Sequence, residues 1–286
     1  MTAEDTTAVG WSFLRSRRWF GYFTLLIIFS IACVWLATWQ FDRRADAQAE
    51  ISRIDRNYDA SPVPLAEAID DPSSFNEDTM KWLPVTVQGT YLDEGTLARG
   101  RPGAGGVGSN LVEAFLTTDG EVFFVDRGWV PVAGIEEIPD NLPVPPTGEV
   151  TITVRLRASE LQISGRTSTD QSVASIHLPE LAELIGHDGV VNTGAFGQLI
   201  DETPAAETGI LAARPERDEG PHLSYALQWY VFIAIAAAGL VYGARQEHRS
   251  LNPAGASVLR QDARRAERKR RRGLSDADEE DALLDQ

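Results

Sequence analysis

Cysteine and histidine are scarce in this 286-residue chain, and both scarcities exclude chemistry. The single cysteine, Cys33, lies inside an apolar run, which excludes an intramolecular disulfide, a cysteine-based metal cluster and a water-facing thiolate nucleophile. The four histidines, His177, His187, His222 and His248, have no paired metal-ligand spacing. The serines also lack the sequence context of a nucleophile elbow. We find no sign of catalysis and predict that the protein is not an enzyme.

Charge is segregated along the chain, which has 42 acidic and 26 basic residues. Two runs carry no charge: Trp19–Phe41, of 23 residues, and Leu223–Ala244, of 22 residues. Between them, Asp42–Gly220 holds 31 acidic and 13 basic residues, a net charge of −18. The tail is basic over Arg245–Arg272, with a net charge of +7, and then acidic over Gly273–Gln286. This distribution excludes a simple cytosolic enzyme.

Each uncharged run is long enough to cross a membrane as a helix, because about 1.5 Å of rise per residue takes it past the roughly 30 Å of bilayer hydrocarbon. A buried core helix is the alternative, but such helices rarely run this long without charge. For the first run, a signal peptide cleaved near Ala45–Ala47 is a second alternative. Signal h-regions span about 7–15 residues, and this run is longer and ends with bulky Trp39. We therefore predict an uncleaved anchor.

Basic residues lie at the outer end of each run, before the first and after the second. Arg15, Arg17 and Arg18 precede the first run, and Arg245 and Arg249 follow the second. The positive-inside rule then predicts cytoplasmic termini and a multi-pass protein of the bacterial plasma (inner) membrane. The predicted divisions are a cytoplasmic N-terminus (1–18), a span (19–41), an extracytoplasmic domain (42–220), a span (221–244) and a disordered cytoplasmic tail (245–286). We expect the basic part of that tail to lie near anionic lipid rather than to bind nucleic acid.

The extracytoplasmic domain has the alternating pattern of half-buried strands. The predicted strands are Leu83–Leu92, Leu111–Thr117, Val122–Asp126, Thr151–Arg157 and Gln198–Ile200. A turn at 118–120 joins the second and third strands, a short helix over 178–185 ends at Gly186, and a polar helix over 45–56 extends the first span. We predict a membrane protein whose two transmembrane helices flank a β-rich α+β domain, built as a mainly antiparallel sheet or open barrel.

The stretch Gly103–Gly108 matches G-x-G-x-x-G. A dinucleotide site needs a strand before this motif and a helix after it. Here Arg99–Pro102 precede it and a β-patterned segment follows. We interpret the motif as a flexible hairpin loop.

Three stretches are more specific. At the end of the first span, Trp35, Trp39 and Arg43 fall on one helix face, which also suits an aromatic belt with snorkelling arginines. In the domain, Val125–Pro131 reads V-D-R-G-W-V-P. A purely structural role is the alternative for this stretch, with Arg127 paired within the domain. At the start of the second span, one helix face carries a histidine and two aromatic residues, a pattern that suits either a planar cofactor or an interfacial anchor: His222, Tyr225 and Trp229.

Together these stretches resemble the Surfeit locus protein 1 family, and in particular its bacterial, actinobacterial-type members. The similarity covers Trp19–Gly243 and includes the layout of two spans around one outer domain. The residues that match the family's motifs are Trp39, Gln40, Arg43, Gly89, Arg127, Gly128, Trp129, His222, Tyr225, Gln228 and Trp229. Ala37 stands where the family usually has a glycine.

The resemblance implies a chaperone-like role in biogenesis of the haem–copper cytochrome c oxidase of the respiratory chain, where haem a must enter subunit I. It implies haem a as a cofactor and His222 as the iron ligand. Trp39, Tyr225 and Trp229 would then pack on the macrocycle, and Arg43 or Arg127 would pair with the propionates. The implied partners are subunit I, other oxidase or supercomplex subunits and the lipid bilayer.

Two other functions stay open at this point. The chain could be a stable accessory subunit of an oxidase or supercomplex, without a cofactor. A membrane-tethered hydrolase would need an acid–base or metal site that the sequence does not display.

Overall fold

The computed structural model describes residues 10–92, 95–103, 106–132, 134, 139, 141–166, 168–169, 171–252, 259–260, 263–264 and 266–268. The acidic end of the tail, predicted to be disordered, lies outside these residues. The chain divides into two compact units. The first comprises 1–45 and 220–286, and the second comprises 46–219.

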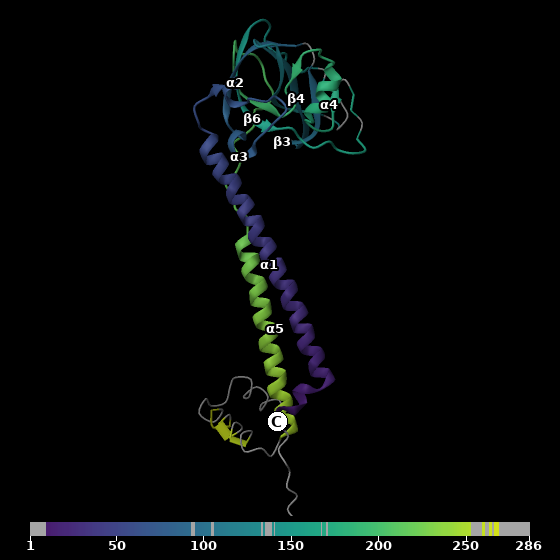
Figure 1. The fold of residues 1–286 in the computed structure, drawn as a ribbon, viewed down its shortest axis with the longest axis vertical. Helices are drawn as coiled ribbons and strands as arrows, with labels where there is room; N and C mark the ends of the chain where they lie inside the picture. The colour runs from purple at the N-terminus through teal and green to yellow at the C-terminus, as the bar shows by residue number, and fades with distance from the viewer. Residues whose placement is uncertain are drawn as a thin grey trace, which may run out of the picture. The chain divides into compact units, whose positions relative to one another are not determined.

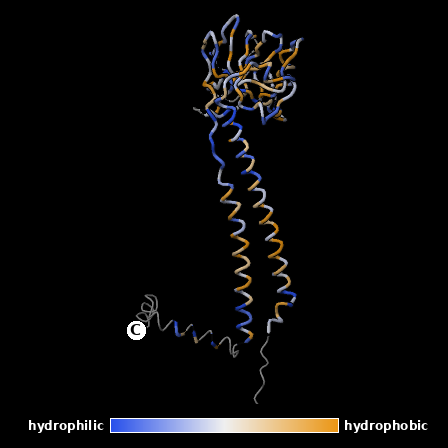
Figure 2. Tube along the Cα trace, turned by 60° about the vertical axis from the view of Figure 1, so that its left-hand side comes forward, coloured by the Kyte–Doolittle hydropathy of each residue, from blue (hydrophilic) through white to orange (hydrophobic). Residues whose placement is uncertain are grey.

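Two long helices lie side by side in the first unit (Figures 1 and 2). They are α1, Arg17–Asn57, which continues into the second unit, and α5, His222–Leu251; a short 3₁₀ helix, Trp11–Arg15, precedes α1. Both are long and apolar enough to span a bilayer, and only 11% and 6% of their most apolar windows are buried. Figure 2 shows the hydrophobic colour along both helices. Their exposed apolar side chains suit lipid, so this is a membrane protein with two candidate spanning helices.

The two helices pack through a heptad seam. Among the buried and half-buried positions of α1, one series has a first step of seven residues and then alternating steps of four and three: Trp19, Leu26, Ser30, Cys33, Ala37, Gln40 and Arg44. In α5 the matching series begins at His222, Ala226 and Trp229. Ala37 and Ala226 are completely buried, and Cys33 is 1% exposed. Small side chains at these positions are typical of helix–helix packing in lipid.

The second unit is a barrel-like sheet (Figure 1). Its strands are β1 Val63–Pro64, β2 Pro84–Tyr91, β3 Thr96–Gly103, β4 Gly106–Thr117, β5 Glu121–Pro131, β6 Val150–Ala158, β7 Ser172–Val173, β8 Val190–Val191 and β9 Ala195–Thr203. Short helices α2, Leu65–Ala68, α3, Glu77–Met80, and α4, Leu178–Ile185, lie between them in sequence. Strands β2, β6, β9, β5 and β4 pair in that order, and β2 also pairs with β4. The pairings therefore close into a ring.

The expectation of a mainly antiparallel sheet is wrong, because the sheet is mixed. Strand β9 is antiparallel to β6 but parallel to β5. Strands β1, β7 and β8 also pair in parallel, with β2, β3 and β5. These three strands have two residues each, too few to show an alternating pattern. The direction of β9 depends on the crossover through α4, which strand periodicity does not encode.

The five predicted strands and the α4 helix are confirmed, with several strands longer than predicted. Gly186 ends α4 in the left-handed conformation, at φ +57°. The polar extension of the first span is also confirmed, because α1 continues to Asn57. Sequence analysis missed β3, whose glycines, proline and arginines hide any alternation and which has a register shift between Arg99 and Arg101.

The core of this unit has two main apolar clusters. One gathers Val85, Phe115, Phe123, Ile152 and other residues of the barrel strands. The second includes Leu178 and Leu181 of α4, so that this helix covers part of the sheet.

Candidate functional site

His222 and Gln40 meet within the first unit and form its most specific polar contact. His222 is the first residue of α5, after Pro221, which suits an early helical position. Its Nδ1 donates a hydrogen bond to Oε1 of Gln40, at 2.9 Å, and both side chains are half-buried. With the proton on Nδ1, Nε2 keeps its lone pair. This is the arrangement of a ligating histidine whose second nitrogen is held by an outer partner.

Gly220 leaves room beside the free nitrogen of this imidazole. Its φ of +68° lies in the left-handed region. A Cβ added at Gly220 would lie 3.2 Å from His222 Nε2. Glycine therefore keeps a side chain away from the atom that would bind a metal.

The predicted aromatic residues lie on the same two helices as this pair. Trp39 and Tyr225 are about half exposed, at 50% and 49%. Trp229 is half-buried and packs edge-on against Phe232, with ring centroids 5.6 Å apart. Arg43 is one helical turn from Trp39 and is exposed. The structure thus joins His222 to Gln40 by a direct contact and places large aromatic surfaces on the flanking positions.

Sequence analysis identified Gln40 only as a match to the family motif and did not predict that it contacts His222. A weak signal was present, because an amide is costly in lipid and seeks a partner. Sequence analysis also missed the contact at the other end of the seam, where Glu247 accepts hydrogen bonds from Arg18 and from Trp19 Nε1. The Gln40–His222 contact at one end of the seam and the Glu247 contacts at the other fix the register of the two helices.

Arg127 lies in the second unit and has a structural environment. Its side chain is completely buried, and its Nη2 lies 2.7 Å from Oε1 of Glu202. The same nitrogen donates to the Glu207 carbonyl, and the guanidinium lies over the Tyr91 ring. These contacts support the alternative in which Arg127 pairs within the domain. This guanidinium is not exposed on the surface, where an incoming propionate would meet it.

The rest of the V-D-R-G-W-V-P stretch is also packed inside the domain. Trp129 donates from Nε1 to the Arg101 carbonyl, at 2.9 Å. Its ring lies against Gly103 and Gly108, where an added Cβ would come within 2.3 and 2.4 Å of it. The glycine-rich motif thus belongs to the hairpin of β3 and β4 and makes room for an indole. Its second and third residues, Ala104 and Gly105, lie outside the described part of the chain.

Asp126 is a buried carboxyl group in the same stretch. Burial raises its pKa, although hydrogen bonds from the Gly128 N–H and from Asn110 Nδ2 oppose that shift. Gln198 also donates to it. Its main role is therefore to accept hydrogen bonds within the barrel.

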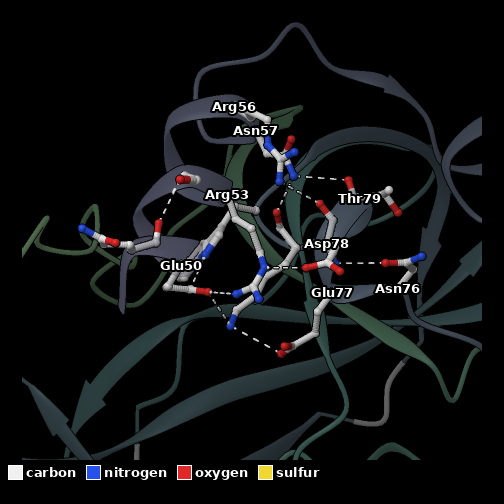
Figure 3. A network of polar contacts seen from close by, with 12 residues as sticks. Glu50, Arg53, Arg56, Asn57, Asn76, Glu77, Asp78 and Thr79 are labelled. Atoms are coloured by element: carbon white, nitrogen blue, oxygen red, sulfur yellow. Dashed lines mark hydrogen bonds and ion pairs between the residues drawn. The ribbon is translucent and has the colours of Figure 1, made fainter. Parts of the chain in front are cut away.

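The polar extension of α1 docks on the segment around α3 through a charged network (Figure 3). Glu50 binds Arg53 at 2.5 Å and Lys81 at 3.1 Å, and it accepts from Trp82 Nε1 at 2.8 Å. Arg53 Nε reaches Asp78 at 3.1 Å. In Figure 3 these side chains point toward one another across the helix and the α3 segment. They hold the extension on the barrel.

Comparisons with known proteins agree with the motifs. Residues 27–234 match the SURF1 family. Uncharacterised SURF1-like proteins of Mycobacterium bovis and of Mycobacterium tuberculosis are each 35% identical over 246 residues, covering 84% of this chain and 88% of theirs. Surfeit locus protein 1 of Xenopus tropicalis is 25% identical over 227 residues, covering 72% of this chain and 70% of its own.

Proposed function

Because this chain belongs to the SURF1 family, which is linked to cytochrome oxidase assembly, we propose that it assists assembly of a haem–copper cytochrome c oxidase by holding haem a for subunit I. In this role it is a membrane-bound assembly factor and not an enzyme. The barrel would lie outside the cytoplasm and both termini inside. The basic residues before α1 and after the apolar part of α5 support that orientation.

The contact between His222 and Gln40 carries this proposal. A neutral imidazole whose Nδ1–H is held by an acceptor presents Nε2 in a fixed direction, which is the usual state of an iron-bound histidine. The donor set therefore fits haem, whose iron would be held by His222 through Nε2. Gly220 keeps the approach to Nε2 open.

The flanking residues suit the rest of such a ligand. Trp39 and Tyr225 expose broad apolar faces on which a macrocycle can pack. Arg43, one helical turn from Trp39, would pair with a propionate. Transfer to subunit I requires modest affinity, and a site with exposed aromatic walls is open enough to release its ligand.

The test is the absorption spectrum of the full chain purified in detergent from cells that make haem a. We expect a haem band in the wild type, its loss in His222→Ala, and a weaker band in Gln40→Ala. His248→Ala is the matched control and should keep the band, because His248 lies near the other end of α5 and stacks on Trp11. A haem-free wild type, or a His222→Ala protein that keeps the band, would overturn the haem proposal.

The assembly role has a separate test, which is deletion followed by oxidase spectra and measurement of subunit I. We expect loss of haem a signal and of subunit I. Transient association with unassembled subunit I supports assembly, whereas persistent co-purification with mature, active oxidase would identify an accessory subunit instead. Normal spectra and turnover in the deletion strain would remove both roles.

A further inference from the structure

An apolar groove lies between α1 and α5 in the first unit, apart from the His222–Gln40 contact. It has a volume of about 380 Å³. Its lining residues are apolar except for one phenol: Tyr22, Leu25, Leu26, Phe29, Ala236 and Leu240. The four residues of α1 follow steps of three and one and three positions, so they share one helix face, and the two of α5 are one turn apart. The groove therefore runs along the helices.

The groove occupies one half of the membrane-spanning length. Tyr22 and Phe29 are the fourth and eleventh residues of the uncharged run that begins at Trp19, and Leu240 is four residues before the end of the other run. At about 1.5 Å per residue, the groove ends about 15 Å from the start of the first run, which is half of the roughly 30 Å of bilayer hydrocarbon. The groove thus has the depth of one leaflet, which suits an acyl chain rather than a spanning helix.

The end of the groove nearest Trp19 is basic. Residues 10–19 and 243–252 contain five arginines and one glutamate. That glutamate, Glu247, is engaged on both oxygens, by Arg18 Nη2 and by Trp19 Nε1. Arg18 is one helical turn before Tyr22, on the groove face, and its side chain is 58% exposed. Its Nε and Nη1 make no hydrogen bond within the described part of the chain, so they can bind an anion at the mouth of the groove.

An apolar channel with a cationic mouth fits an anionic phospholipid. A guanidinium binds phosphate oxygens through its N–H donors, and the Tyr22 hydroxyl is a further donor one turn away. Basic pockets between transmembrane helices bind acidic lipid headgroups in this way. We propose that the groove binds one anionic phospholipid of the leaflet at the basic end, with its phosphate at Arg18 and one acyl chain against Leu25, Phe29 and Ala236.

The bond to Glu247 gives Arg18 a fixed position at the groove mouth and leaves two of its nitrogens for the phosphate. A zwitterionic headgroup would bring its own cation to this basic end, so the net charge of the lipid should decide the preference. The proposal needs neither haem nor the His222–Gln40 contact, and it therefore stands or falls independently of the proposed function.

The experiment titrates the full chain in detergent with dioleoyl phosphatidylglycerol and counts bound lipids by native mass spectrometry. We expect one lipid to bind before any second one. Dioleoyl phosphatidylcholine, with the same chains and no net charge, should bind about fivefold more weakly, which is the usual contribution of one basic residue near an anionic lipid. Dihexanoyl phosphatidylglycerol, with the same headgroup and chains too short to fill the groove, should bind at least about tenfold more weakly.

Two pairs of variants locate the site. Arg18→Gln should remove the preference for phosphatidylglycerol, whereas Arg17→Gln, about 140° from Tyr22 around the helix, should keep it. Ala236→Phe should fill the groove and abolish the first binding step for both dioleoyl lipids. Ala238→Phe, the same change at an exposed position outside the groove, should leave that step intact. Thermal unfolding of each sample establishes that it is folded.

Because the three lipids are compared on the wild type, the test holds even if a variant misfolds. Equal binding of the two dioleoyl lipids would overturn the anionic preference, and equal binding of the dihexanoyl lipid would show that the groove holds no acyl chain. Equal losses within either pair of variants would place the lipid elsewhere. A dimeric chain that takes up no lipid would overturn the proposal in favour of a second copy as the occupant.

Discussion

At the residue scale, the buried pair of Arg127 and Glu202 shows how a motif residue can be structural. Arg127 is in β5 and Glu202 is in β9, and neither side chain exceeds 3% exposure. Tyr91 of β2 donates its hydroxyl to the same carboxylate, at 2.9 Å. Three strands are therefore joined at one buried charge pair, which must stay complete because an isolated buried charge is costly.

Replacing Arg127 by methionine should lower the free energy of unfolding by about 3–5 kcal/mol, because Glu202 would be left charged and unpaired in the core. Chemical denaturation in detergent measures the loss. The control is Arg217→Met, which breaks an exposed pair with Asp55 at 2.7 Å and should cost about 0–1 kcal/mol. Equal losses in the two variants would contradict a structural role for Arg127.

Asp126 gives a pH-dependent prediction. Burial raises its pKa in the folded state, so folding binds its proton more tightly than the unfolded chain does. Its stabilising contribution is complete below the unfolded pKa of about 4 and is lost as pH rises through the folded value. We expect Asp126→Asn to gain stability relative to the wild type as pH increases above about 4. Chemical denaturation at a series of pH values measures this difference. If the free energy of unfolding changes with pH in the same way for both proteins, burial of Asp126 has no such effect.

At the scale of the element, the α1–α5 seam depends on small side chains. Cys33 and Ala37 of α1 and Ala226 of α5 are each at most 1% exposed. A larger side chain in the seam would separate the helices, and His222 and Gln40 lie at the same end of it as Ala226.

Ala226→Leu should open this seam, and Cys33 is a built-in reporter because it is the only cysteine in the chain. We expect a membrane-permeant maleimide to label Cys33 faster in Ala226→Leu than in the wild type, by about tenfold if opening becomes about 1.4 kcal/mol easier. Ile31→Leu, at a position 65% exposed, should leave the labelling rate unchanged. Fast labelling of the wild type would show that the seam is not closed.

The β3–β4 hairpin depends on a close contact between Trp129 and two glycines. Gly103→Ala should lower the free energy of unfolding by about 1–3 kcal/mol, because its Cβ would overlap the indole. The same substitution made in Trp129→Leu should cost clearly less, since the smaller side chain leaves room. The two costs form a double-mutant cycle. Additive costs would show that the strain of Gly103→Ala does not come from Trp129.

At the scale of the whole molecule, charge and apolar surface are sorted along the chain. The segment 42–220 has a net charge of −18, and Arg245–Arg272 have a net charge of +7. This asymmetry predicts the topology, because basic segments stay in the cytoplasm.

Alkaline phosphatase inserted after Leu161, which is 89% exposed in the second unit, should therefore be active. The same enzyme fused after Gln286 should be inactive, and a fluorescent protein fused there should be bright. The reverse pattern would show that the topology is the opposite of the one predicted. An N-terminus found near residue 48 of the mature protein would instead establish cleavage of the first apolar run.

Much of the local structure follows from sequence because it depends on neighbours in the chain. The strand at 151–157 alternates between apolar and polar residues, and the observed strand runs from Val150 to Ala158. Gly186 marks the end of α4 for an equally local reason, the left-handed conformation. The β3 strand was missed because its side chains carry no alternating signal. The candidate site was found only as a set of helical positions, and the contact between His222 and Gln40 joins residues 182 positions apart.

The sequence by itself determined the two apolar helices, the acidic β-rich domain between them and the family, because hydrophobic length, alternation and motifs are properties of continuous segments. Only the tertiary structure decided that the sheet is mixed, that Arg127 is committed to Glu202, and that Gln40 holds the imidazole of His222. Strand direction, burial of a charge and the partner of a polar side chain depend on which distant segments meet, and residue order alone does not specify that.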